Sequence, residues 1–255
     1  MIYLIASVAS AFFGMASSLG AVTLLRPLLD AISPLPPASV SLLCTMAALC
    51  ASLVSAFFAL SQPIPLPQDD LLMLATGGAL GGILGDLAAS RFLSRLLPAH
   101  AVLLQNALLL TLVALPLLYF GHLARSLRPL ALTRLLTFPL ALIIGLFGAF
   151  LSFGAEPLTL MLFFLLFDAD DEESTFAALT VSLFAMAGKL LTMLIRMRFS
   201  LPDANVLLWL IPGMIAGSLL AMLPQAQHIL RRPGESLLRL SAFTSLLNMA
   251  AAYLI

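Results

Sequence analysis

The chain has 255 residues, of which 62% are apolar and only 9% are charged, and its formal net charge is zero. A soluble domain carries roughly 25% charged residues, so this composition excludes an ordinary soluble fold and predicts an integral membrane protein. The few scattered charges also exclude a nucleic-acid-binding surface, which needs clustered basic residues. Long unbroken apolar runs exclude a transmembrane β-barrel, whose strands alternate polar and apolar residues over about 10 positions.

Apolar segments follow one another along the whole chain. They lie at 2–29, 39–60, 71–93, 100–120, 134–167, 174–195, 204–223 and 236–255. A helix of about 20 apolar residues crosses a bilayer core of about 30 Å, so these segments predict an all-α, multi-pass membrane protein with about eight helical elements. The first basic residue is Arg26, inside the first segment, whereas a signal peptide carries its basic residues first, so we expect no cleaved signal peptide.

The first and fifth segments are each interrupted by small residues. FGMASSLGA (13–21) lies in the first segment and FGAFLSFGA (147–155) in the fifth, with Phe, Gly, Ser, Gly and Ala at the same places in both copies. Glu156 and Pro157 directly follow the second copy. We predict that each of these two segments is a broken helix.

Other motifs recur in the same order. The triplet Val-Ser-Leu occurs at 40–42 and 181–183, and glycines spaced four residues apart occur at 78 and 82 and again at 213 and 217. The spaced glycines are typical of close helix packing in lipid. The chain is therefore predicted to contain two four-element repeats, 1–123 and 124–255, each opening with a broken helix.

The relative direction of the two repeats depends on the opening element. Four crossings per repeat would make the repeats parallel, whereas an opening hairpin that does not cross would make them inverted. Inverted repeats with broken helices are the usual plan of secondary transporters, which bind substrate near the bilayer midplane. Basic residues divide almost evenly between the two sides under either arrangement, so the positive-inside rule does not orient the chain.

A helix broken inside a membrane has unpaired backbone groups that lipid cannot satisfy. The free N–H groups and the positive dipole end of the second half-helix can bind an anion, and small residues let the ligand reach the backbone. The predicted substrate-binding residues are Ser18, Gly20 and Ala21 at the first break and Ser152, Gly154, Ala155 and Glu156 at the second. The alternative is that the glycines only permit packing and kinks.

Two ionisable residues belong to this hypothesis because charges inside a membrane are costly. Lys189 lies within the sixth segment, where it could neutralise a bound anion, and we include it in the substrate site; alternatively, its stem could extend toward Arg196, about 10 Å along the helix. Glu156 could cap the helix that Pro157 begins, or pair with Lys189. The other interpretation of Glu156 is proton coupling or contact with a cationic substrate.

Several segments resemble the TauE/SafE family of sulfite exporters. SLGAVTLLRPLL (18–29) and SFGAEPLTLMLFF (152–164) are similar to the two Gly-rich signatures of that family. LPPASVSLL (35–43) and TFAALTVSLF (175–184) resemble its following helix start, and GGALGGILGDLAASRFLSRLLP (77–98) resembles its third helix. The resemblance covers nearly the whole chain. It implies a multi-spanning transporter of sulfite, sulfonates and related sulfur-containing organic anions.

The sequence thus predicts a secondary transporter, or permease, for a small anion. Its expected partners are the lipid bilayer, the anionic substrate and a proton or ion that drives transport, and its expected location is the inner (cytoplasmic) membrane. No metal-ligand spacing and no nucleotide-binding loop is visible, so we expect no cofactor, no metal and no enzymatic activity. Glu156 leaves open a neutral or zwitterionic substrate, and a membrane scaffold without transport activity is the alternative from another class.

Overall fold

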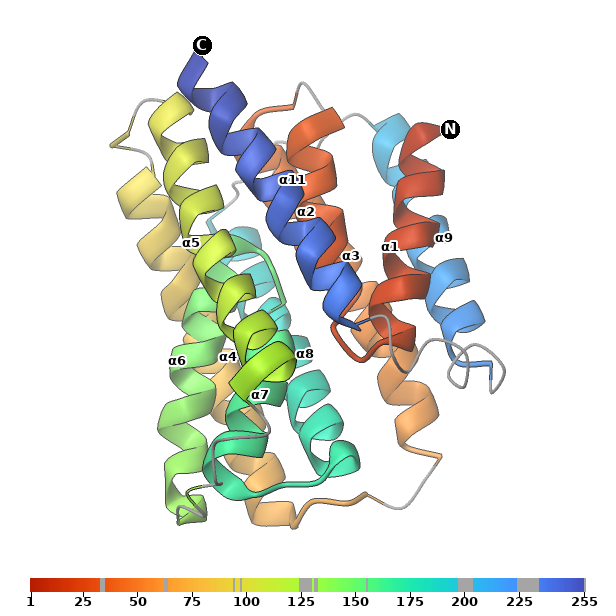
Figure 1. Cartoon of the computed structure of the whole chain (residues 1–255), viewed down its shortest axis with the longest axis vertical. Coiled ribbons are helices and arrows are strands. Elements are labelled where there is room, and N and C mark those ends of the chain that lie inside the picture. The colour runs from red at the N-terminus through yellow and green to blue at the C-terminus, as the bar shows by residue number, and fades with distance from the viewer. Residues whose placement is uncertain are drawn as a thin grey trace.

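A computed structural model shows a protein built from helices packed side by side (Figure 1). It describes residues 1–32, 35–61, 64–93, 95–96, 98–123, 130, 133–154, 156–196, 204–223 and 234–254. Within these ranges there are ten α-helices, a π-helical turn at Tyr119–Leu123, a 3-10 turn at Arg134–Leu136, and no strand. The predicted all-α class is confirmed.

The helices follow the predicted apolar segments. They are α1 (Ile2–Ala16), α2 (Val22–Ile32), α3 (Pro37–Ala59), α4 (Gln68–Leu93), α5 (Pro98–Leu118), α6 (Thr137–Leu151), α7 (Glu156–Phe167), α8 (Asp171–Ile195), α9 (Ala204–Ala221) and α11 (Gly234–Leu254). Five helical stretches of the described residues, which include α3, α4 and α8, are long and apolar enough to cross a membrane. A multi-pass membrane protein is therefore the fold that the structure supports.

Both predicted breaks are present, which is why ten helices replace eight elements. Ser18 and Ser152 have left-handed φ angles of 57° and 56°, and two residues later Gly20 and Gly154 have φ angles of 83° and 77°. The left-handed region is costly for most residues and easy for glycine. The backbone conformation therefore explains why small residues recur at both breaks. The two breaks therefore share one backbone conformation as well as one sequence pattern.

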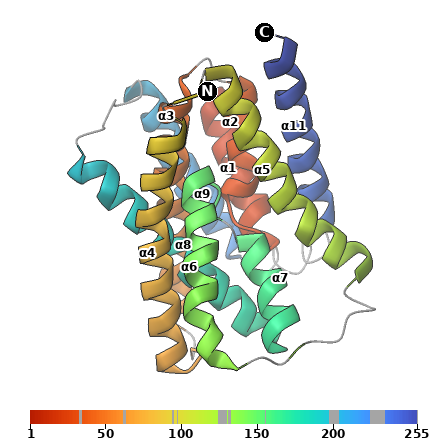
Figure 2. The same cartoon turned by 90° about the vertical axis from the view of Figure 1, so that its left-hand side faces the viewer.

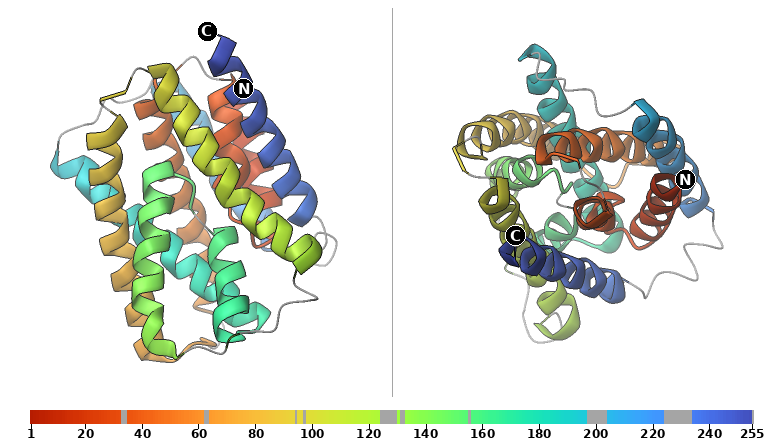
Figure 3. Two further views of the ribbon diagram at one scale, coloured as in Figure 1. Left: turned by 60° about the vertical axis from the view of Figure 1, so that its left-hand side comes forward. Right: turned by 90° about the horizontal axis from the view of Figure 1, so that it is seen from above.

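The two opening hairpins enter from opposite sides. In Figure 1, α1 descends from the N-terminus at the top and α2 returns upward, whereas α6 rises from the bottom and α7 returns downward. Figure 3 shows the same division between an upper pair, α1 and α2, and a lower pair, α6 and α7. The long helices follow this inversion, because α3 runs downward and α8 upward. Both termini lie at the same end of the molecule (Figure 2).

Helices of each half also pack against helices of the other half. The first half-helix of one half packs against the fourth helix of the other, since α6 packs on α4 and α1 packs on α9. In the same way, α7 packs on α5 and α2 packs on α11. The side-by-side course of α4 and α6 is visible in Figure 2. Each opening hairpin is thus held by the long helices of the opposite half.

Glycines make these close approaches possible. A Cβ atom at Gly78 or Gly82 would meet backbone atoms of Val181 and Ala185 in α8, as expected for glycines that serve packing. The predicted match between Gly78 and Gly213 is one residue out of register. Gly213 lies over the Leu4 carbonyl of α1, and it is Gly77 that lies over the corresponding carbonyl of α6, at Phe138. By these neighbours, Gly77 and Gly81 are the counterparts of Gly213 and Gly217.

Candidate functional site

The two helix breaks meet at the carboxyl group of Glu156. A Cβ atom added to Gly20 would overlap this carboxyl group, and a Cβ atom added to Gly154 would overlap it as well. One side chain therefore lies directly against the backbone of both breaks, which are 134 residues apart in sequence. Because Glu156 is the first residue of α7, its carboxyl group lies at the positive end of that half-helix.

Glu156 is only half satisfied by hydrogen bonds. Its residue is 8% exposed, and Oε1 accepts a hydrogen bond of 2.6 Å from Ser182 Oγ. Oε2 is buried and has no hydrogen-bond partner among the described residues. The same residues contain no ion pair between Glu156 and Lys189, so the predicted pairing is wrong. A free, buried carboxylate oxygen therefore faces the two breaks.

Lys189 lies on the other side of the second break. It is 1% exposed, and its Nζ donates hydrogen bonds to Ala149 O (2.5 Å), Ser152 Oγ (2.6 Å) and Ser41 Oγ (3.0 Å). Ala149 is one of the last residues of α6, whose terminal carbonyls have no partner inside the helix and carry negative partial charge. Lys189 thus caps the end of α6, and the alternative that it extends toward Arg196 is wrong.

The serine pair beside Lys189 offers a hydrogen-bond donor. Ser41 Oγ and Ser152 Oγ are 2.7 Å apart, and either one could donate to the other. Both hydroxyl oxygens also accept from Lys189, so whichever serine accepts the shared bond keeps its own O–H hydrogen. The cluster therefore combines a buried positive charge with a hydroxyl that can bind an anion.

A second buried cation, Arg26, lies on α2 and was not predicted as a site residue. It is 1% exposed, with Nε 3.1 Å from Asp30 Oδ2 and Nη2 donating to Gln105 Oε1 at 3.1 Å. Nη1 has no hydrogen-bond partner among the described residues. An arginine inside an apolar segment was the available signal, since such residues are functional candidates.

The other predicted site residues are placed less centrally. Ser18 is partly buried at the first break, and Ala21 is 2% exposed and packs in an apolar cluster. Ala155 lies outside the described residues. The structure thus brings Gly20, Gly154 and Glu156 together, whereas it places Ala21 in a packing role.

The two Val-Ser-Leu triplets contribute site residues that were not predicted from the sequence. Their serines are Ser41 and Ser182, which bind Lys189 and Glu156 respectively. Their recurrence was the signal, but the contacts join helices far apart in sequence. Both serines meet the second break, so the site is not symmetric between the halves.

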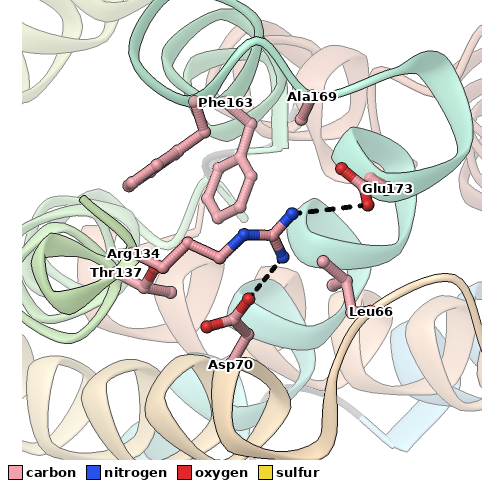
Figure 4. Close-up of a pocket in the computed structure, with 8 residues that line it drawn as sticks. Leu66, Asp70, Arg134, Thr137, Phe163, Ala169 and Glu173 are labelled. Atoms are coloured by element: carbon pink, nitrogen blue, oxygen red, sulfur yellow. Dashed lines mark hydrogen bonds and ion pairs between the residues drawn. The ribbon is translucent and has the colours of Figure 1, made fainter. Parts of the chain in front are cut away.

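A separate hollow lies at the end of the molecule where α4, α6 and α8 begin (Figure 4). Arg134 lies across it, with Nη1 2.5 Å from Asp70 Oδ2 and Nη2 3.7 Å from Glu173 Oε1. None of its lining residues belongs to a break: they are Leu66, Asp70, Arg134, Thr137, Phe163, Phe167, Ala169 and Glu173. The ion pairs join three helix ends, and we assign the hollow a structural role.

By fold and site, the molecule is a multi-helix membrane protein in which two inverted broken helices meet at buried charges, an arrangement typical of transporters. The described residues contain no group of three or more His, Cys, Asp or Glu side chains that could hold a metal ion.

The family follows from comparison with known proteins. The family model described as "Sulfite exporter TauE/SafE" matches residues 1–253, and the chain belongs to this family of membrane transporters. Comparison with curated proteins and with solved structures gave no match. The resemblance stated from the sequence motifs is therefore confirmed, and a transporter family agrees with the prediction that the chain is not an enzyme.

Proposed function

We propose that this chain is a secondary transporter of a small anion, namely sulfite, a sulfonate or a related sulfur-containing organic anion. The observation that carries this proposal is the cluster of Lys189, Ser41 and Ser152 at the second break. A fully buried ammonium is costly in a membrane, and its retention beside a helix break favours an anionic ligand. The family match supports the sulfur-containing class of substrate.

The proposed mechanism is alternating access. Residues 1–123 and 124–255 act as the two inverted repeats, and the substrate binds where the breaks meet, at Gly20 and Gly154. The exchange of helix contacts between the halves supports this scheme, because each opening hairpin can move with the long helices of the opposite half. The transporter resides in the inner (cytoplasmic) membrane, and an ion or proton gradient supplies the drive.

The test is flux from vesicles. Proteoliposomes loaded with sulfite or ethanesulfonate should release the anion faster than protein-free vesicles, and Gly20→Leu or Gly154→Leu should remove this difference. Both substitutions place a side chain where the Glu156 carboxyl now lies. Gly121→Leu is the matched control, since a Cβ atom there meets nothing within 4 Å. Unchanged flux in both break variants would remove the site assignment, and absent flux in the unmodified protein would favour a scaffold.

A zwitterionic metabolite is the second candidate substrate. The free Oε2 of Glu156 favours it, because a carboxylate could receive the ammonium group of such a ligand while the Lys189 cluster receives its acidic group. Thermal-shift measurements separate the candidates, since a ligand that binds the folded state raises apparent stability. Stabilisation by taurine but not by ethanesulfonate would select the zwitterion.

A further inference from the structure

The Glu156 carboxyl group occupies the space that the two breaks leave open. Both glycines lack the Cβ atom that would fill this space, and both point the same open side at the same carboxyl. A glycine at positive φ presents its backbone to a neighbour without obstruction, which is how backbone amides reach an anionic ligand. In this structure the neighbour at both breaks is a carboxyl group of the chain itself.

This carboxyl group has no counterpart in the first half. Val22 is the first residue of α2, as Glu156 is the first residue of α7, and Val22 is a fully buried apolar residue. One carboxyl group therefore serves two breaks. A pair of symmetric helix caps would require one acidic residue in each half, so a simple capping role does not explain why this side chain lies against Gly20.

Few side-chain hydrogen bonds hold the Glu156 carboxyl group in this position. Only Ser182 donates to it through a side chain, and Oε2 is unpartnered among the described residues. Leaving a buried carboxylate oxygen unpaired is unfavourable, and the cost falls when the group takes a proton or a ligand supplies a donor. The position is thus held by few interactions, in contrast to Lys189 with its three hydrogen bonds.

None of the described charged residues forms an ion pair with Glu156. Lys189 on α8 donates to Ser152, two residues before Gly154, and the Gly154 backbone lies against the Glu156 carboxyl group. An anion bound by the Lys189 cluster would therefore share the second break with the charge of Glu156.

We propose that Glu156 has two roles in substrate binding. Its ionised carboxylate competes with the substrate anion for the same position, and its protonation allows the anion to bind there. The inference rests on the proposed function. The ionised carboxylate occupies the anion position between Gly20 and Gly154 and repels a second negative charge. When the carboxyl group binds a proton, it becomes neutral and can leave this position, so that the substrate anion takes its place beside the backbone amides and the Lys189 cluster. Binding of one anion is then linked to binding of one proton.

The experiment measures binding of labelled ethanesulfonate to the purified protein, because the charge of this sulfonate does not change near neutral pH. Glu156→Gln removes the charge and retains the shape, and we expect it to bind at least about tenfold more tightly than the unmodified protein at about pH 8, since like charges at close range oppose binding. The difference should shrink at about pH 5, where protonation neutralises the native carboxyl group. Glu156→Val, which copies Val22, gives a second variant if the Gln protein is not monodisperse.

Asp70→Asn is the matched control, because it removes another buried carboxylate, which pairs with Arg134 in the separate hollow and does not line the breaks. It should give no gain in affinity. Equal affinity of the Glu156 variants and the unmodified protein at both pH values would overturn the proposal, and so would weaker binding in the variants, which would assign Glu156 to a cationic group of the ligand. If ethanesulfonate and sulfite bind neither the variants nor the unmodified protein, the proposed function fails and this inference fails with it. Binding by the Glu156 variants alone would support both.

Discussion

At the scale of single residues, Lys189 is the best-supported part of the site. Its ammonium has three N–H donors, and each has a partner on a different residue: the α6 carbonyl of Ala149 and the hydroxyls of Ser152 and Ser41. These bonds offset much of the cost of burying the charge. The positive charge remains without an ion-pair partner among the described residues, which leaves it available to an anion.

Replacing Lys189 with Met should abolish anion transport. Met retains a long apolar stem but removes the charge, so we expect flux to fall at least about tenfold, together with a loss of stability of about 1 to 3 kcal/mol from the three hydrogen bonds that Lys189 donates. Flux in proteoliposomes measures the first effect and thermal unfolding the second. Arg196→Met removes a half-buried charge just past the end of the same helix, where Arg196 donates to Ser90 Oγ on α4, and should leave flux unchanged. Normal flux in Lys189→Met would exclude the residue from the site.

Gly20 should be sensitive to substitution for two separable reasons. Gly20→Ala places a Cβ atom at positive φ, which costs roughly 1 to 2 kcal/mol, and also drives it into the Glu156 carboxyl group. A double-mutant cycle with Glu156→Ala removes the overlap and leaves only the backbone cost. Thermal unfolding should therefore show that Gly20→Ala destabilises the Glu156→Ala protein less than it destabilises the native one. Equal effects in both backgrounds would mean that the two groups do not touch.

At the scale of helices, α4 of the first half packs closely against two helices of the second half, α6 and α8. One row of its glycines, Gly77, Gly81 and Gly85, meets carbonyls of α6, and a second row, Gly78 and Gly82, meets α8. The two rows lie on adjacent faces because successive residues on a helix differ by about 100°. The helix can therefore pack closely against two neighbours at once.

Gly82→Ala should destabilise the protein by about 2 kcal/mol or more, because its methyl group would overlap the Ala185 backbone and helix backbones cannot yield as flexible side chains do. Gly121→Ala is the control, since its methyl group meets nothing within 4 Å. Thermal unfolding in detergent compares the two variants with the native protein. A Gly82→Ala protein as stable as the control would contradict the close α4 and α8 packing.

At the scale of the whole molecule, two hairpins inserted from opposite sides bring their breaks to one place. The sequence predicted the breaks because their cause is local: a repeated pattern of small residues around Ser18 and Ser152 adopts the same left-handed conformation twice. It also predicted the helical class, because long apolar runs have one structural solution in lipid. The inverted direction of the two repeats could not be predicted from the sequence, because parallel and inverted repeats both divide the basic residues almost evenly between the two sides of the membrane.

The contacts inside the site were less predictable for a physical reason. Lys189 draws its partners from α3, α6 and the second break, and Glu156 reaches across to Gly20 in the other half. Such contacts depend on how helices pack in three dimensions, whereas sequence spacing reports only neighbours along one helix. Opposite charge alone predicted that Glu156 pairs with Lys189. The pairing is wrong because Glu156 is hydrogen-bonded to Ser182 instead, and Lys189 to Ser41 and Ser152.

Selenite offers the most direct test of an anion site between the breaks, because it is close to sulfite in shape and charge and selenium scatters anomalously. In crystals of the protein soaked with selenite at about pH 5, where the account expects Glu156 to admit an anion, an anomalous difference map should show a peak beside Gly20 and Gly154, within reach of the Ser41, Ser152 and Lys189 cluster. The peak should disappear in Lys189→Met crystals. Selenium peaks found only at the surface, with none between the two breaks, would contradict the assignment of this site.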